Sequence, residues 1–87
     1  MSWASFRELD QRTGLPKGSA FRAFKRREPQ LQEGQDFRLL RPGRDDAEID
    51  ALRQARRVYP NSVNIVLLGD GLTTRLLEDL GGPTEGQ

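Results

Sequence analysis

Apolar side chains at helical spacing predict a short first helix close to the start of the chain. Ser5 and Glu8 form a capping box, in which the Ser5 hydroxyl accepts from the Glu8 amide and the Glu8 carboxylate reaches back to the Ser5 amide. Phe6 and Leu9 then lie on one narrow face that is available for packing. We therefore expect a helix over residues 6–13.

A second helix is expected after a tight turn, over residues 16–27. Gly14 suits the positive φ with which many helices end, and Leu15 would fill the space beneath the turn. Pro16 suits the first position of a new helix, and Pro29 prevents that helix from continuing. Its inward face would consist of Ala20, Phe21 and Phe24.

Two later segments have the pattern of strands. Residues 36–41 alternate partly, which places Phe37 and Leu39 on one face. Residues 63–68 are apolar except for Asn64, partly β-branched and bounded by turn residues. We expect the two segments to form an antiparallel pair. Because both faces of the second strand are apolar, helices would cover one face and a partner chain could cover the other.

Two further helices complete the predicted elements. Asp45 or Asp46 can cap a third helix, and a last helix is expected over residues 70–80. The inward stripe of the third helix would consist of Ala47, Ala51, Leu52, Ala55 and Tyr59. The last helix carries a stripe of Leu72, Leu76, Leu77 and Leu80. That leucine stripe either docks back on the domain or forms a dimer or partner contact.

Together these elements predict an α+β fold. The expected architecture is a helix-turn-helix with a small two-stranded antiparallel sheet, an elaborated winged helix, followed by a C-terminal helix. With 87 residues the chain is too short for two independent cores, so we expect one domain over residues 1–80 and a disordered tail over residues 81–87.

Composition then narrows the function classes. The chain contains no cysteine and no histidine, which excludes a disulfide framework and metal sites built from thiolates or imidazoles. Catalysis would have to rest on carboxylates that read better as helix caps and solvated positions, so we expect no enzyme, no metal and no cofactor. No apolar run approaches the length of a membrane span or a secretory segment, which predicts a cytoplasmic protein without membrane contact.

Charge is distributed unevenly along the chain. The net charge of +1 divides into +4 for residues 1–30, 0 for residues 31–60 and −3 for residues 61–87. Residues 17–27 carry five basic side chains and no acidic one. This concentration favours a nucleic-acid-binding face over a merely solvated basic helix, because a polarised molecule presents its positive end to phosphate.

The order of helix, turn, basic helix and strands, with the runs GLPKGSAF, EGQDFRLL and NIVLL, resembles small DNA-binding modules of phage and mobile-element regulators. It is similar to winged helix-turn-helix proteins of the MerR or excisionase type and to N-terminal domains of phage antirepressors. The resemblance covers residues 5–80, its specific part is residues 6–27, and the helix between the two strands departs from it. It implies a sequence-specific transcriptional regulator, such as a repressor, that binds double-stranded DNA with residues 16–27 in the major groove.

The resemblance also implies roles for individual residues. Arg22 would make a bidentate contact to guanine, and the amides at the start of the second helix, with Lys17 and Ser19, would meet a phosphate or the nearest base edges. Lys25, Arg26 and Arg27 would bind phosphates. Further candidate phosphate contacts are Arg38, Arg56 and Arg57. A single helix rarely suffices, so we expect a homodimer that reads two half-sites, without a small-molecule effector.

Arginines at the end of the third helix have an alternative, structural explanation. Arg53, Arg56 and Arg57 fall where cations favour a helix dipole, and they could pair with Glu48 or Asp50.

Two other functions compete with DNA binding. A protein-binding adaptor or inhibitor, of the antitoxin or phage-encoded type, would use the leucine stripe of the last helix. An RNA-binding module is disfavoured, because such modules usually stack bases on sheet aromatics and Phe37 is the sole strand aromatic.

Overall fold

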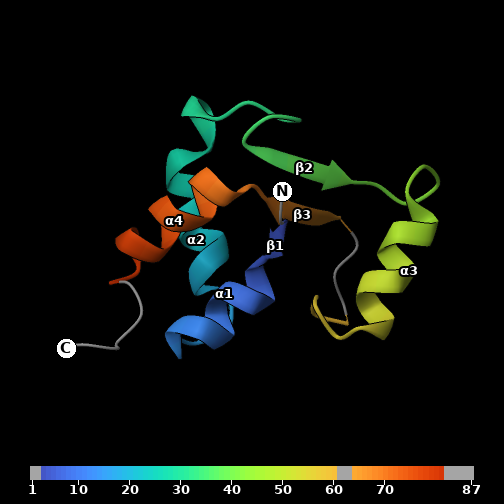
Figure 1. The fold of residues 1–87 in the computed structure, drawn as a ribbon, viewed down its shortest axis with the longest axis horizontal. Coiled ribbons are helices and arrows are strands. Elements are labelled where there is room, and N and C mark those ends of the chain that lie inside the picture. The colour runs from blue at the N-terminus through green and yellow to red at the C-terminus, as the bar shows by residue number, and fades with distance from the viewer. Residues whose placement is uncertain (1–2, 61–63, 82–87) are drawn as a thin grey trace.

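The computed structural model describes residues 3–60 and 64–81. Along the chain lie β1 (Ala4–Ser5), α1 (Phe6–Thr13), α2 (Ser19–Arg27), the 3₁₀ turn η1 (Glu28–Gln30), β2 (Phe37–Leu40), α3 (Asp46–Gln54), β3 (Ile65–Leu68) and α4 (Asp70–Asp79) (Figure 1). The described residues therefore form an α+β fold, with four helices and one antiparallel sheet. Val63, the predicted start of the second strand, and residues 82–87 of the predicted tail lie outside the described residues.

The sheet has three strands, in the order β1-β3-β2, and not the expected two. The predicted antiparallel pair is present, with Phe37 opposite Leu68 and Leu40 opposite Ile65. The additional strand is β1, which pairs with the other edge of β3 and sets Ala4 opposite Leu68. It escaped prediction because a two-residue strand is too short to show alternation.

Each face of the sheet is covered by helices of the same chain. One cluster joins Phe37 and Leu68 to side chains of α1, α2 and α4. The other joins Leu40 and Ile65 to side chains of α3 and of the segment after it. Figure 1 shows the sheet between α3 and the other three helices. A partner chain is therefore not needed to cover either face, contrary to one expectation.

Helix α1 begins and ends as predicted. The Ser5 hydroxyl accepts from the Glu8 amide at 3.2 Å, and the Ser5 amide donates to the Glu8 carboxylate at 2.9 Å. Gly14 ends the helix with a φ of 71°, and its amide donates to the Asp10 carbonyl. Both ends are fixed by interactions within a few residues, which is why the sequence revealed them.

Helix α2 begins at Ser19, three positions later than predicted. Pro16 lies in the turn, and Gly18 precedes the helix with a φ of 93°, a conformation that cannot continue helical geometry. The predicted end at Arg27 is confirmed, since Pro29 lies in η1. Two apolar residues expected inside are exposed, Leu15 by 38% and Phe21 by 46%. The buried face of α2 consists of Ala20, Ala23 and Phe24, so Ala23 takes the place in the core that was expected for Phe21.

Of the stripe predicted for α3, Leu52 is confirmed as buried, but the alanines are not. Ile49 and Leu52 are buried, whereas Ala47, Ala51 and Ala55 are exposed. The larger side chains bury more apolar surface, so they decide which face turns to the sheet. Asp45 precedes the helix, but its carboxylate accepts from the Arg41 amide at 3.0 Å and not from a helix amide.

The leucine stripe of α4 lies inside the molecule. Leu72, Leu76 and Leu77 are buried in the cluster with α1 and α2, and Leu80 packs against it. Of the two explanations given for this stripe, docking on the domain is therefore correct, and the dimer or partner contact is wrong. None of the described helices is both long and apolar enough to cross a membrane.

Candidate nucleic-acid interface

The turn between α1 and α2 is held by the carboxylate of Asp10, which is only 3% exposed. Its Oδ2 accepts from the Gly18 amide at 3.0 Å, and its Oδ1 accepts from the Ala20 amide at 2.8 Å. The Tyr59 hydroxyl donates to the same carboxylate at 2.5 Å. One side chain of α1 thus satisfies amides at the start of α2 and fixes how α2 is presented.

Sequence reasoning missed Asp10. An acidic residue within a short helix reads as a solvated position, and its partner Tyr59 is 49 positions away. The carboxylate also occupies amides that were expected to meet DNA. Because the Gly18 and Ala20 amides donate to Asp10 and the Ser19 amide donates to the Pro16 carbonyl, these three groups are not available to a phosphate.

Tyr59 connects the turn to two cations. Burial, together with the hydrogen bond to Asp10 and the charge of that carboxylate, raises the pKa of Tyr59 to about 12. Its hydroxyl therefore stays protonated at neutral pH and remains a donor. The Lys17 ammonium lies 4.7 Å from the centre of the Tyr59 ring, and the Arg7 guanidinium lies 5.7 Å from it. Both distances allow cation–π attraction.

The outward face of α2 carries Arg22, Lys25 and Arg26, all exposed. Arg22 and Arg26 make no ion pair with any residue in the described ranges 3–60 and 64–81, and Arg22 only approaches the Ser19 hydroxyl at 3.5 Å. Lys25 pairs with Glu28 at 2.5 Å across an exposed surface. An exposed pair of this kind contributes little free energy, so Lys25 can exchange its partner for a phosphate.

Phe21 lies on the same face of α2 and lines a groove. The groove has a volume of about 380 Å³ and is lined by Phe6, Lys17, Gly18, Phe21, Tyr59, Asn64 and Val66. The Phe21 ring packs edge-on against Phe6, with the centroids 5.6 Å apart. An apolar surface therefore lies between the cations of α2 and those near Tyr59.

Two residues assigned to DNA have structural partners. Arg27 makes a bidentate contact to Asp79 of α4, with nitrogen–oxygen distances of 2.5 and 2.9 Å. The hydrogen bond raises the pKa of Arg27 and lowers that of Asp79. Ser19 is 8% exposed, and its hydroxyl donates to the Pro16 carbonyl at 2.7 Å. The Ser19 side chain belongs to the turn, which corrects its expected contact with DNA, whereas Arg27 joins α2 to α4.

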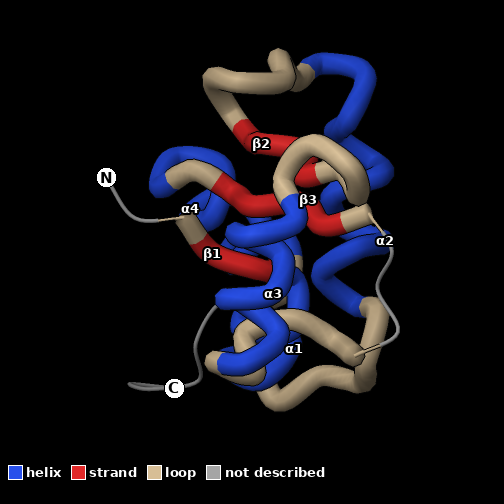
Figure 2. The backbone as a smooth tube through the Cα atoms, turned by 90° about the vertical axis from the view of Figure 1, so that its right-hand side faces the viewer, coloured by secondary structure: helices blue, strands red, loops and turns tan. Residues whose placement is uncertain are grey.

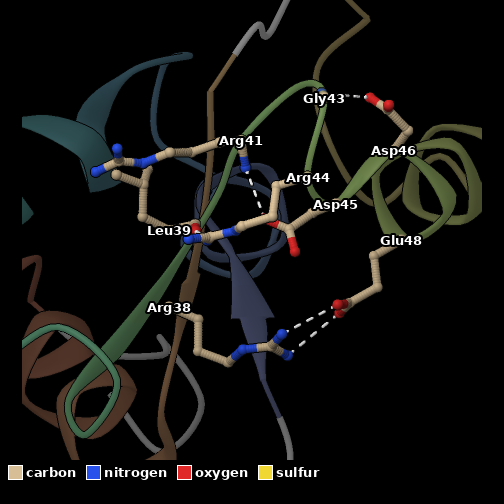
Figure 3. A network of polar contacts seen from close by, with 8 residues as sticks. All are labelled: Arg38, Leu39, Arg41, Gly43, Arg44, Asp45, Asp46 and Glu48. Atoms are coloured by element: carbon tan, nitrogen blue, oxygen red, sulfur yellow. Dashed lines mark hydrogen bonds and ion pairs between the residues drawn. The ribbon is translucent and has the colours of Figure 1, made fainter.

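Arg38 is also engaged within the chain. Its guanidinium pairs with Glu48 of α3 at 3.0 Å (Figure 3). The same group lies 5.7 Å from the centre of the Trp3 ring. The neighbouring connection from β2 to α3 is fixed by Arg44, which donates to Asp45 at 2.9 Å and to the Leu39 carbonyl at 2.8 Å. Figure 3 shows the Arg41 side chain extending away from these carboxylates.

Arg57 connects the segment after α3 to the start of α1. Its guanidinium pairs with Glu8 at 3.1 Å and donates to the Trp3 carbonyl at 2.5 Å, while the Arg57 carbonyl accepts from the Ser5 hydroxyl. Burial alone would raise the pKa of Glu8, but hydrogen bonds from Arg57 and Ser5 outweigh it and lower that pKa. Arg57 therefore pairs with Glu8 of α1, and not with Glu48 or Asp50 as expected.

Among the expected DNA contacts, Lys17, Arg22 and Arg26 are therefore exposed and without an ion pair to any described residue, and Lys25 has only a weak one. These cations and the exposed Phe21 surround the first turns of α2, so the surface can bind anions beside apolar groups. No cluster of three or more carboxylates suited to a metal ion lies in the described part of the chain. Comparisons with protein-family models, with curated proteins and with solved structures gave no match to this chain.

Proposed function

We propose that this protein binds double-stranded DNA sequence-specifically and regulates transcription, with α2 in the major groove. The observation that carries the proposal is the outward face of α2, where Arg22 and Arg26 are exposed without ion pairs to described residues. Asp10 supports it, because the carboxylate fixes the start of α2 and so orients that face before DNA arrives. An orienting contact that is already formed reduces the entropy lost on binding.

Each exposed side chain has a role that fits its chemistry. Arg22, near the start of the helix, reads guanine through its paired N–H groups. Lys17 and Arg26 bind phosphates, and Lys25 does so by leaving Glu28. Phe21 offers an apolar contact to a thymine methyl group. Phosphate contacts supply affinity in this arrangement, and Arg22 with Phe21 supplies the preference for sequence.

The winged-helix assignment and the homodimer belong to the same proposal. Here α3 separates the strands β2 and β3, so a DNA-contacting wing would be the connection between β2 and α3, which exposes Arg41. A second copy would read a second half-site. It would meet the first through a surface other than the leucine stripe of α4, since that stripe is buried.

The test is binding to mixed-sequence duplex DNA over a series of salt concentrations. We expect affinity to fall steeply as salt rises, with each phosphate contact adding about −0.9 to the slope of log affinity against log salt. Selection of a preferred site would follow. Arg22→Ala should then cost about 1–3 kcal/mol at that site and little on random DNA.

Arg75→Ala provides the matched control, because Arg75 is an exposed arginine on α4 and no contact with DNA is assigned to it. It should leave both affinities unchanged. Absence of binding at low salt would contradict the proposal. If Arg22→Ala bound both the selected site and random DNA as tightly as the parent does, Arg22 would have no role in reading the site.

One observation supports the alternative function, a protein-binding adaptor. Its expected surface, the leucine stripe, is buried, but Phe21 is 46% exposed beside a groove of about 380 Å³. If DNA binding is absent, Phe21→Ala identifies whether that groove binds a protein. Binding of this kind would depend weakly on salt, unlike phosphate contact.

A further inference from the structure

A hollow beside α1 gathers arginines from two helices. It has a volume of about 370 Å³ and is lined by Arg7, Arg53, Arg56, Val58 and Pro60. Of these residues Arg7 belongs to α1, Arg53 lies at the end of α3, and Arg56 follows that helix. No carboxylate is among the described residues that line it. Three positive charges thus converge from parts of the chain that are far apart in sequence.

The fold holds Arg7 at this place. Its Nη1 donates to the Val58 carbonyl at 3.2 Å, which anchors the guanidinium while its other N–H groups stay available. Val58 itself is buried in the cluster beneath α3. The segment after α3 therefore returns to α1 (Figure 2). Arg56 lies on this segment.

Arg56 occupies a position that favours glycine. Its φ is 58°, and it is the one non-glycine residue with positive φ in the described part of the chain. The Arg56 amide donates to the Arg53 carbonyl and the Arg57 amide to the Leu52 carbonyl, each at 3.0 Å, which is the hydrogen-bond pattern of a Schellman motif. Glycine would end α3 with less strain, so an arginine here costs stability and suggests a role for its charge.

The helix dipole explains only part of this arrangement. Cations near the C-terminus of α3 are favoured by its partial negative charge, which accounts for Arg53 and in part for Arg56. Arg7 comes from the first turn of α1, where the helix dipole disfavours a cation. Arg7 and Arg56 carry like charges at one hollow, and an anion bound there would relieve their mutual repulsion.

Tyr59 lies between the hollow and the face of α2, because cations from both places lie over its ring. Lys17 lies over the Tyr59 ring on the side of the turn, and Arg7 also lies over that ring, at 5.7 Å. Lys17 and Tyr59 both line the groove beside Phe21, and Arg7 lines the hollow. A basic path therefore runs from the start of α2, across one aromatic ring, to the end of α3.

We propose that the hollow of Arg7, Arg53 and Arg56 binds a backbone phosphate of the duplex, beyond the segment that α2 contacts. This inference rests on the proposed DNA binding and deepens it. Guanidinium groups suit the ligand, because their planar N–H pairs match the oxygens of a phosphate. The contact is independent of base sequence, and it fixes the orientation of α2 from a second side.

The experiment compares Arg56→Gly and Arg53→Gln with the parent and with Arg75→Gln on both selected-site and mixed-sequence duplexes. Arg56→Gly should reduce the salt slope by about 0.9 and weaken binding to both duplexes by the same factor. Its thermal midpoint should not fall, because glycine suits the backbone there. Arg53→Gln should lower the slope similarly, whereas Arg75→Gln should not change it.

The outcomes separate this inference from the proposed function. If the parent binds DNA but Arg56→Gly and Arg53→Gln keep its salt slope and affinity, the hollow does not bind phosphate, although the role of α2 stands. If the parent fails to bind at low salt, both proposals fall together. A loss confined to the selected site would also overturn the inference, since phosphate contacts do not discriminate sequence.

Discussion

At the scale of single residues, Asp10 determines how α2 is presented. Its carboxylate is buried and accepts from the Gly18 amide, the Ala20 amide and the Tyr59 hydroxyl. A buried carboxylate is costly unless donors surround it, and here the donors are groups that would themselves be unsatisfied without it. The turn and the carboxylate therefore depend on each other.

Replacing Asp10 by Ala should lower the free energy of unfolding by about 2–3 kcal/mol, because it leaves partly buried donors without an acceptor. Chemical denaturation measures this change. Tyr59→Phe is the matched control, since it removes only one of the three hydrogen bonds and should cost about 1 kcal/mol. Equal stability of the Asp10→Ala variant and the parent would show that water replaces the carboxylate.

Tyr59 gives the protein a pH dependence in the alkaline range. Its pKa is raised from 10.0 to about 12, so the folded state binds the phenolic proton more tightly than the unfolded chain does. The stabilisation is fully present below pH 10 and is lost as pH rises from 10 towards 12. Tyrosinate absorbance checks this directly, because Tyr59 is the chain's single tyrosine.

The folded protein should titrate with a midpoint near 12, and a denatured sample near 10. Asp10→Asn should bring the folded midpoint down, since it removes the negative charge beside the phenol while burial remains. A midpoint near 10 in the folded parent would mean that Tyr59 is neither buried nor bonded to Asp10.

At the scale of elements, the ends of the helices differ in how they are specified. Helix α1 is closed at both ends by residues within its own sequence, Ser5 with Glu8 and then Gly14. Helix α2 is started by Gly18 and by a carboxylate from α1. Helix α3 ends at Gln54, and the left-handed residue that closes it two positions later is Arg56, where glycine would be less strained.

Arg56→Gly should therefore raise the free energy of unfolding by about 1 kcal/mol, because it relieves the left-handed conformation of a residue with a side chain. Thermal or chemical unfolding in the absence of DNA measures the change. Arg56→Ala separates strain from charge, since alanine keeps the Cβ and removes the guanidinium. If Arg56→Ala stabilised the protein as much as Arg56→Gly, charge repulsion within the hollow would be the larger cost.

At the scale of the whole molecule, a small sheet lies between two hydrophobic clusters. Helices α1, α2 and α4 form one cluster with Phe37 and Leu68, while α3 forms the other with Leu40 and Ile65. The acidic C-terminal helix is held to the basic one by Arg27 and Asp79 as well as by leucines. The positively charged N-terminal part of the sequence and its negatively charged C-terminal part are thus joined by an ion pair where α2 and α4 meet.

Leu76→Ala should lower the free energy of unfolding by about 2–5 kcal/mol, because it leaves a cavity in the cluster of α1, α2 and α4. The loss should be the same at low and high protein concentration. Leu80→Ala, at a half-buried position, should cost less. If the destabilisation by Leu76→Ala disappeared at high protein concentration, the leucine stripe would have to form a dimer contact after all.

Sequence reasoning located most elements but not the faces they present. The strand pair and the alternation at Phe37 and Leu39 were predicted, because residues two apart in a strand share a face. The inward stripe of α3 and the exposure of Phe21 were not, since several faces of a short helix can carry apolar residues. Burial against a distant surface selects among them.

The candidate site was also predicted only in part: its exposed cations were expected, but most of its internal contacts were not. Lys17, Arg22 and Arg26 are exposed as expected, because a dense basic run on a short helix must leave several cations in water. Ser19 and Arg27 have structural partners, and Asp10 was missed. Arg56 was a candidate phosphate contact, but its place beside Arg7 and Arg53 in one hollow was not predicted. These features depend on contacts to residues 59, 79 and 53–58, which composition and spacing do not reveal.

Local patterns of the chain were enough to predict the α+β class, the closed ends of α1, the pairing of β2 with β3 and the basic character of α2. Each rests on interactions between residues close together, or on alternation that a single strand displays. Long-range packing was needed to show that β1 joins the sheet, that the leucines of α4 face inward, and that Asp10 meets Tyr59 across 49 positions. Burial of apolar surface has no direction of its own, so the packing of the whole chain chose these partners.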